Sequence, residues 1–298
     1  MATAAKNNKI KATPGERVFD IFNVVFLLLL SVVCLYPMIH VLFASLSNGV
    51  QLMKHTGLLL WPAGFSSAAY KAVIENDMIF TGYGNTLIIV VLGTTLNIIM
   101  SALGAYFLAR NDQAIGKAAM IFIVITMFFS GGMIPGYLNV RSLGLYNSLW
   151  ALILPGAINT FNMIILKTAF MSIPASLEES AKLDGAGHFT ILWKIFLPLS
   201  KATIAVLILY YGVAHWNAWF GAMMYIQDRA KYPLQLVLRE ILIVNDMSNM
   251  VNVAADVEQI SDTIKYAVVM VTTLPILVLY PFLQKYFVKG VMVGAVKG

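Results

Sequence analysis

The sequence has few charged residues and a single cysteine. Charged side chains make up 11% of the 298 residues and hydrophobic ones 59%, whereas soluble domains contain about 25% and about 45–50%. A chain with so little charge cannot cover its apolar surface with polar groups in water. The composition excludes an ordinary soluble protein and predicts an integral membrane protein.

Sequence motifs for catalysis and cofactor binding are also missing. Cys34 lies in an apolar run, and no CxxC pair or Cys/His spacing indicates a disulfide framework or a metal site. No G-x-x-x-x-G-K-[ST] phosphate loop occurs, so we do not expect this chain to bind or hydrolyse ATP. His40, His55 and His188 have no nearby carboxylate and nucleophile in a catalytic pattern. We therefore expect no enzyme activity, and no metal or cofactor bound by this chain.

Long apolar runs make up most of the chain. Crossing about 30 Å of hydrocarbon takes about 20 helical residues, and six runs approach that length. They are Asn23 to Ala44, Asn85 to Ala109, Ala118 to Pro135, Ser148 to Leu166, Leu199 to Trp219 and Tyr266 to Leu283. None carries an ionisable residue at its middle, which disfavours a proton- or sodium-coupled carrier. The expected fold is all-α, a polytopic membrane protein with six transmembrane helices.

The basic residues are distributed unevenly between the two sides of these spans. Of 20 Lys and Arg, 13 lie in the N-terminal tail, near Arg110, between Lys167 and Lys201, and in the C-terminal tail. The positive-inside rule makes these segments and both termini cytoplasmic. The net charge of +6 is thus a topology signal, and no nucleic-acid partner is expected. We expect residues 1–16 to be a disordered basic tail and residues 17–298 to form the membrane domain.

A polar stretch, residues 174–198, interrupts the apolar pattern on the predicted cytoplasmic side, and we call it the elbow. Ser176 as N-cap and Glu179 three residues later predict a capping box at the start of a first helix, and Gly185 predicts its end. Phe189, Trp193 and two further apolar residues, Leu192 and Phe196, are spaced to line one face of a second helix. Pro198 is expected to open the next span. On shape alone, an amphipathic helix lying at the membrane interface is an equal alternative.

The spacing within the elbow resembles the EAA motif of ABC importer permeases, which reads EAA, three residues, G, nine residues, I-x-L-P. Here Glu179-Ser180-Ala181 is followed by Gly185 and by Ile195-Phe196-Leu197-Pro198, with serine in place of the second alanine. In that family this loop docks on a cytoplasmic ATPase. The resemblance implies a type I ABC importer permease fold and a coupling role for Glu178, Glu179, Ala181, Asp184, Gly185, Ala186, Phe189 and Trp193.

The resemblance extends over nearly the whole chain. "NTLIIVV" and "GAYFLAR" are similar to the second span of maltose-type carbohydrate permeases, and "HWNAWFGAMMYIQDRAKYPLQLVLREIL" is similar to the polysaccharide and oligosaccharide branch. This resemblance implies import of a carbohydrate across a bacterial plasma membrane. The implied partners are a second homologous permease subunit, an ABC ATPase dimer that binds ATP and Mg, and an extracytoplasmic sugar-binding protein, in addition to the lipid bilayer.

Uncharged polar and aromatic residues are candidates for the substrate path. They are Asn159 and Asn162, three residues apart after the predicted kink at Pro155-Gly156, and Tyr210, His215, Trp216 and Asn217 near the end of the fifth run. Hydrogen bonds between helices explain the two asparagines at least as well. Anchoring at the membrane interface competes with sugar stacking for the aromatic residues.

The segment 220–265 is too long for a simple connection, and we expect it to lie outside the cell. It offers Leu234, Leu236, Leu238, Ile241 and Leu242 for packing, and Asp246, Asp256, Glu258 and Asp262 as an acidic face. Contact with the binding protein and a helical cap over the bundle are equal alternatives for it.

Two other classes of function compete with the importer. A carrier or channel that works without a motor is disfavoured by the spacing of the elbow. A structural or assembly protein is disfavoured by the joint resemblance of elbow, spans and C-terminal tail.

Overall fold

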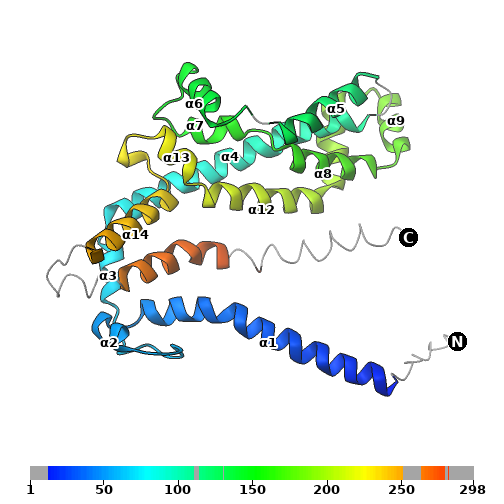
Figure 1. Cartoon of the computed structure of the whole chain (residues 1–298). Helices are drawn as coiled ribbons and strands as arrows, with labels where there is room; N and C mark the ends of the chain where they lie inside the picture. Colours follow the sequence, from blue (N-terminus) through cyan, green and yellow to red (C-terminus); the bar gives the residue numbers. More distant parts are fainter. Residues whose placement is uncertain (1–12, 111–113, 130, 251–262, 279–280, 282–298) are drawn as a thin grey trace. The chain divides into compact units, whose positions relative to one another are not determined.

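The computed structural model describes residues 13–110, 114–129, 131–250, 263–278 and 281 (Figure 1). Within these residues the regular structure is helical, apart from an isolated antiparallel bridge between Ser47 and Phe65. The all-α prediction is confirmed. The chain divides into two units, one of Met1–Lys71 with Val253–Met270 and one of Ala72–Asn252 with Val271–Gly298.

The first unit contains the long helix α1 (Pro14–Ser45). Thr13 caps it, because its hydroxyl accepts from the Glu16 amide while the Glu16 carboxylate accepts from the Thr13 amide, at 3.3 and 2.7 Å. The helix thus begins inside the expected tail, of which residues 1–12 lie outside the described residues. None of its most apolar 18-residue window is buried, as expected for a helix that faces lipid.

The segment after α1 is held by hydrogen bonds within the same unit. Asn48 caps α2 (Gly49–Lys54) by accepting from the Val50 amide at 3.1 Å. The Ala63 amide donates to the Ser47 hydroxyl at 2.9 Å, and the Leu59 amide donates to the hydroxyl of Tyr36 on α1 at 3.1 Å. These contacts fix the connection to α3 (Ala68–Ile74).

The second unit holds most of the remaining helices. They are α4 (Asp77–Ala109), α5 (Ala114–Phe128), α6 (Met133–Ser142), α7 (Trp150–Ile153), the 3₁₀ turn η1 (Leu154–Gly156), α8 (Thr160–Met171), α9 (Ala175–Leu183), α10 (His188–Ile191), the π turn η2 (Leu192–Phe196), α11 (Leu197–Leu199), α12 (Lys201–Asn217), α13 (Phe220–Tyr225), the 3₁₀ turn η3 (Arg229–Lys231) and α14 (Leu234–Met250). A further helix, Thr263–Val278, has residues in both units.

Helix α4 is central to this unit and packs against α8, α12 and α14 (Figure 1). Gly82, Gly93 and Gly104 recur every eleven residues along it, about three helical turns. A Cβ added at Gly82 would lie 3.1 Å from Leu234 Cα of α14, one at Gly93 2.6 Å from His215 Nε2 of α12, and one at Gly104 2.6 Å from Met163 Sδ of α8. The three glycines therefore let α4 approach all three neighbours closely.

A buried polar cluster reinforces this packing. Asn97 on α4, 1% exposed, donates through Nδ2 to the Gly156 carbonyl at 2.6 Å. Because a carbonyl only accepts, the other amide atom is Oδ1, which accepts from His215 Nε2 at 2.7 Å. Interhelical hydrogen bonds of this kind stabilise helix packing in lipid.

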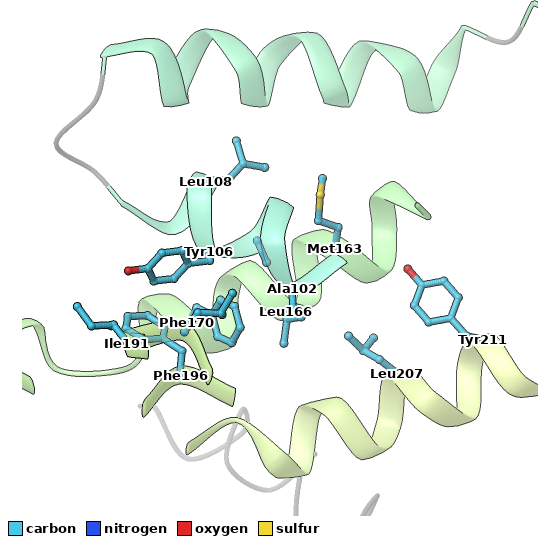
Figure 2. Packing of buried hydrophobic residues seen from close by; sticks show 12 residues of the cluster. Ala102, Tyr106, Leu108, Met163, Leu166, Phe170, Ile191, Phe196, Leu207 and Tyr211 are labelled. Carbon is cyan, nitrogen blue, oxygen red and sulfur yellow. The ribbon is translucent and has the colours of Figure 1, made fainter. Parts of the chain in front are cut away.

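An apolar core gathers where α4, α8 and α12 meet the elbow. Figure 2 shows Tyr106, Phe170, Ile191 and Phe196 grouped together, with Leu207 and Tyr211 on α12. The rings of Tyr106 and Phe170 each meet Phe196 edge to face, at 5.1 and 5.3 Å between centroids. This aromatic geometry favours a single arrangement of the three helices and the elbow.

Several predicted spans have different boundaries in the structure. The third apolar run was predicted to reach Pro135, but α5 ends at Phe128, and Pro135 belongs to α6, whose N-cap Gly132 has φ +87°. The left-handed backbone at this glycine turns the chain. The kink at Pro155-Gly156 is confirmed, with 51° between Trp150–Gly156 and Thr160–Met171.

Among the described residues, some helices are long and apolar enough to span a membrane and others are not. Two helices, α1 and α4, are long and apolar enough to cross a membrane, and the number rises to five if each bent pair of helices is one span. Thr263–Val278 is a shorter apolar helix, and the predicted end of the sixth span at Leu283 lies outside the described residues. Six spans with cytoplasmic termini stay a prediction.

The predicted extracytoplasmic segment is folded onto α4. The Thr86 hydroxyl accepts from the Leu234 amide at 2.8 Å, and Asn85 donates to the carbonyls of Ala230 and Tyr232 at 2.8 and 3.1 Å. Leu234 and Leu236 are buried, while Leu238, Ile241 and Leu242 are half-buried. These contacts favour the cap interpretation for residues 220–243. Asp256, Glu258, Asp262 and the side chain of Asp246 lie outside what the structure describes.

The contact at Gly93 yields a prediction with a matched control. Gly93→Ala should lower the unfolding free energy by about 1–3 kcal/mol, the usual cost of overpacking, because the new methyl group would displace His215 from Asn97. Gly84→Ala should be neutral or stabilising, since a Cβ at Gly84 meets nothing within 4 Å. Thermal unfolding in lipid nanodiscs measures both, and equal stability of the two variants would contradict close packing at Gly93.

Candidate functional site

The first helix of the elbow, α9 (Ala175–Leu183), begins two residues earlier than predicted. Pro174 is its N-cap, with no side-chain hydrogen bond, and Ser176 lies inside the helix. The predicted capping box of Ser176 and Glu179 is therefore wrong. Proline fixes φ and has no amide hydrogen, so it can begin a helix without a capping side chain. Glu179 is consequently not used in a cap and is exposed.

The end of α9 agrees with the sequence. Gly185 has φ +82°, the Ala186 amide donates to the Ala181 carbonyl at 2.9 Å, and the Gly185 amide donates to the Lys182 carbonyl at 3.0 Å. This pair of bonds is a Schellman motif, which requires a left-handed residue where Gly185 stands. The turn directs the chain into α10 without leaving those carbonyls unpaired.

The second arm of the elbow is less regular than predicted. α10 passes into the π turn η2 and then α11, and the helical axis bends by 86° before α12. Pro198 lies within α11, so the prediction that it opens the next span is wrong; that helix begins at Lys201. A π turn contains one residue more than an α turn and is frequent at functional sites.

The π turn divides the apolar face that the sequence predicts. Leu192 and Phe196 are buried, at 2% and 5% exposure, whereas Phe189 and Trp193 are 71% and 55% exposed. The prediction of one shared face is wrong, since the altered helical phase separates the two pairs. One pair anchors the arm in the core and the other faces outward.

The predicted motif residues likewise separate into two groups. Ala181 and Ala186 pack against the apolar core, and Glu178 is paired with Arg110 at 2.7 Å and with Lys182 at 2.9 Å. Glu179, Asp184, Phe189 and Trp193 are exposed, together with Leu183, which sequence reasoning missed and which is 89% exposed. The elbow thus exposes large apolar side chains together with two carboxylates and the lysines Lys182 and Lys194.

The residues predicted to line the substrate path do not form one cluster of mutual contacts. The Asn159 side chain caps α8 by accepting from the Asn162 amide at 3.0 Å, and Asn162 is buried. The Trp216 indole donates to the Thr272 carbonyl at 3.2 Å, and His215 pairs with Asn97. Tyr210 and Asn217 are exposed and lie seven residues apart, on one face of α12.

A small cavity lies beside His215. Its volume is about 200 Å³, and its lining residues are Ile89, Ala151, Leu152, His215, Ala218, Gly221, Ala222 and Tyr225. Among the described residues no group of three or more His, Cys, Asp or Glu side chains could hold a metal ion.

The sequence analysis did not identify two residues of the α4 region that contact the predicted sites. Arg110 ends the "GAYFLAR" stretch and contacts the elbow, and Thr86 follows Asn85 in "NTLIIVV". Both stretches resemble the family, so the signal was present in the sequence. The residues that Arg110 and Thr86 contact, however, are distant from them in the sequence.

Helices of this length and apolarity, with a polar elbow anchored in their core, define a multi-pass membrane protein. A family model described as "binding-protein-dependent transport system inner membrane component" matches residues 114–293. The chain belongs to this family. Its all-helical fold is that of an ABC importer permease.

Curated relatives cover nearly the whole chain. The polygalacturonan/rhamnogalacturonan transport system permease protein YtcP of Bacillus subtilis (strain 168) is 46% identical, with 95% of this chain and 99% of that protein covered. Protein LplC of the same organism is 41% identical over 96% of this chain and 97% of its own length.

Solved structures agree on the fold. A chain from a bacterial ABC transporter involved in the import of the acidic polysaccharide alginate is 31% identical and superposes with a TM-score of 0.85, covering 94% of this chain and 100% of that one. A second chain, 16% identical with a TM-score of 0.55, covers 90% of this chain and 94% of its own length. It comes from the alginate transporter in complex with an alginate pentasaccharide-bound periplasmic protein, and shows likeness of fold alone.

The left-handed turn at Gly185 yields the second prediction. Gly185→Val should strain the turn by about 1–2 kcal/mol and disturb the elbow while the spans still insert, because the residue lies outside the core. Gly187→Val is the control: Gly187 has φ −75°, and neither position has an atom within 4 Å of an added Cβ. Binding-protein-dependent uptake by the assembled complex should fall for Gly185→Val alone. Equal uptake by the two variants would show that the turn is not required.

Proposed function

We propose that this chain is a permease subunit of an ATP-driven ABC importer for oligosaccharides. It would form part of the path across the bacterial plasma membrane together with a second homologous permease subunit. An extracytoplasmic sugar-binding protein would deliver the substrate. Two cytoplasmic ATPase subunits, which bind ATP and Mg, would drive the cycle. The named relatives support a carbohydrate substrate, since one is named for the transport of polygalacturonan and rhamnogalacturonan and another comes from a transporter involved in the import of alginate.

One observation carries this proposal, namely the two-sided elbow. Its inner side is fixed in the core by Ile191, Leu192 and Phe196, each 5% exposed or less. Its outer side exposes Leu183 and Phe189 beside the carboxylates of Glu179 and Asp184. Large apolar side chains exposed on a polar, predicted cytoplasmic segment are typical of a protein interface. An ATPase with an apolar groove and charged residues at its rim would fit this surface.

The exposed face of α12 supplies candidates for the substrate path. Tyr210 and Asn217 lie on it, and neutral hydroxyl, amide and aromatic groups suit a sugar. Asn159, Asn162, His215 and Trp216 have structural roles in capping and packing, so in this proposal they shape the path. A carrier or channel without a motor remains the rival function.

The third prediction tests the docking surface. When the chain is expressed with its ATPase and second permease, the ATPase should co-elute. Phe189→Ala combined with Glu179→Gln should reduce the recovered ATPase by about tenfold, because it removes an exposed apolar contact and a charge from one small interface. Phe65→Ala is the matched control, with 76% exposure against 71% for Phe189, on the predicted opposite side of the membrane. Unchanged recovery in the double variant would contradict docking at the elbow.

The fourth prediction separates the importer from its rival. Purified without partners, the chain should bind no labelled ATP in equilibrium dialysis, because it has no phosphate loop. It should also show no sugar uptake in proteoliposomes until the ATPase, the second permease and the binding protein are added. Uptake by the chain alone would establish the carrier and overturn the importer.

A further inference from the structure

Arg110 follows the last residue of α4, and its side chain contacts both arms of the elbow. Its Nη2 forms an ion pair with Glu178 Oε1 at 2.7 Å, and its Nη1 donates to His188 Nδ1 at 2.6 Å. Glu178 belongs to α9, and His188 is the first residue of α10. One guanidinium therefore connects the end of α4 to the helix before the Gly185 turn and to the helix after it.

The surroundings of Arg110 hold the guanidinium in place. Its side chain is only 14% exposed, as is that of Glu178 at 15%. The guanidinium also lies over the ring of Tyr106, one turn back on α4, at 5.3 Å from the ring centroid. Charged pairs shielded from water in this way are stronger than exposed ones. The planar fork of arginine can serve two acceptors while it stacks on a ring, which lysine cannot do.

The second cation near Glu178 differs in one respect. Lys182 pairs with the same carboxylate at 2.9 Å, but it lies on α9 itself, four residues later, and its side chain is 42% exposed. This pair stabilises α9 without reaching α4. Arg110 and Lys182 thus share a partner, and only the Arg110 pair joins two elements.

His188 accepts from Arg110 as a neutral ring. A guanidinium nitrogen has no lone pair to accept with, so Nδ1 must be unprotonated and the ring proton lies on Nε2. The Tyr106 hydroxyl is also near this nitrogen, at 3.5 Å. The contact to the second arm therefore depends on an acceptor at residue 188.

Helix α4 continues from this contact to the predicted outer side. It is an uninterrupted helix of 33 residues without proline, about 50 Å long at 1.5 Å per residue. In its first third, the side chains of Asn85 and Thr86 hold residues 230–234 through hydrogen bonds to the backbone of that segment. A hydrogen-bonded helix transmits axial movement and rotation along its length, as in shear motions of packed helices.

We propose that Arg110 is the positioning residue that makes the elbow and α4 move as one body. A displacement of the elbow would pass through the Arg110 contacts to α4, and from α4 to residues 230–234 at its other end. This inference rests on the proposed function, since it requires a partner that moves the elbow. It assigns Glu178 to an internal contact and leaves Glu179 to the partner.

The test uses the complete complex of both permeases, ATPase and binding protein in proteoliposomes. Arg110→Gln should lower the sugar imported per ATP hydrolysed by about fivefold or more, the lower end of ordinary coupling between sites. The maximal uptake rate should fall while the KM for sugar-loaded binding protein stays unchanged, because Arg110 lies on the predicted cytoplasmic side, away from the surface expected to meet the binding protein. Lys182→Gln is the control and should keep the wild-type ratio.

Two further variants keep the proposal falsifiable if Arg110→Gln assembles poorly. The exchange Arg110→Glu with Glu178→Arg should recover much of the coupling ratio, since it restores an ion pair between α4 and α9. His188→Gln, which keeps an acceptor, should couple better than His188→Leu. A wild-type ratio in Arg110→Gln, or an assembled exchange variant that stays uncoupled, would overturn the proposal. Absence of ATP-driven uptake by the wild-type complex would instead refute the proposed function.

Discussion

Close approach of other helices to α4 is the constraint on which the second unit depends. Lipid tails are as apolar as leucine, so helices in a bilayer gain little from hiding apolar surface and must associate through tight packing and hydrogen bonds. Gly82, Gly93 and Gly104 allow that packing at three levels of one helix. The Asn97 bonds to Gly156 and His215 supply the hydrogen bonds. The aromatic core and the elbow are assembled on this framework.

The fold class and the existence of the elbow could be predicted because their signals are local. Hydrophobic runs give helices, and the left-handed turn at Gly185 follows from glycine, whichever residues surround it. The ends of elements were harder. The capping box at Ser176 was wrong because Pro174 already begins the helix, and the start of the fifth span was wrong because the chain bends after Pro198. Each of these two helix starts depends on which of two neighbouring sequence signals determines it.

The distribution of roles within the site could not be predicted, because it depends on contacts between distant residues. Glu178 and Glu179 are adjacent and chemically the same, yet Glu178 is paired with Arg110, 68 positions away in the sequence. The sequence pattern within the elbow does not distinguish the roles of Glu178 and Glu179. In the same way, His215 and Trp216 were suitable for a sugar by residue type alone. Their partners Asn97 and Thr272 show that packing also uses those residues.

The π turn at Leu192–Phe196 lies in the interval between Gly185 and the Leu197-Pro198 pair. A π turn arises when one residue is inserted into an α-helix. The interval therefore holds one residue more than a continuous helix would need for the same length. Deleting that residue would leave a sound helix but rotate everything before it by about 100°. The length of this interval therefore determines the angle about the helix axis at which the outward side chains of the first arm lie relative to α12.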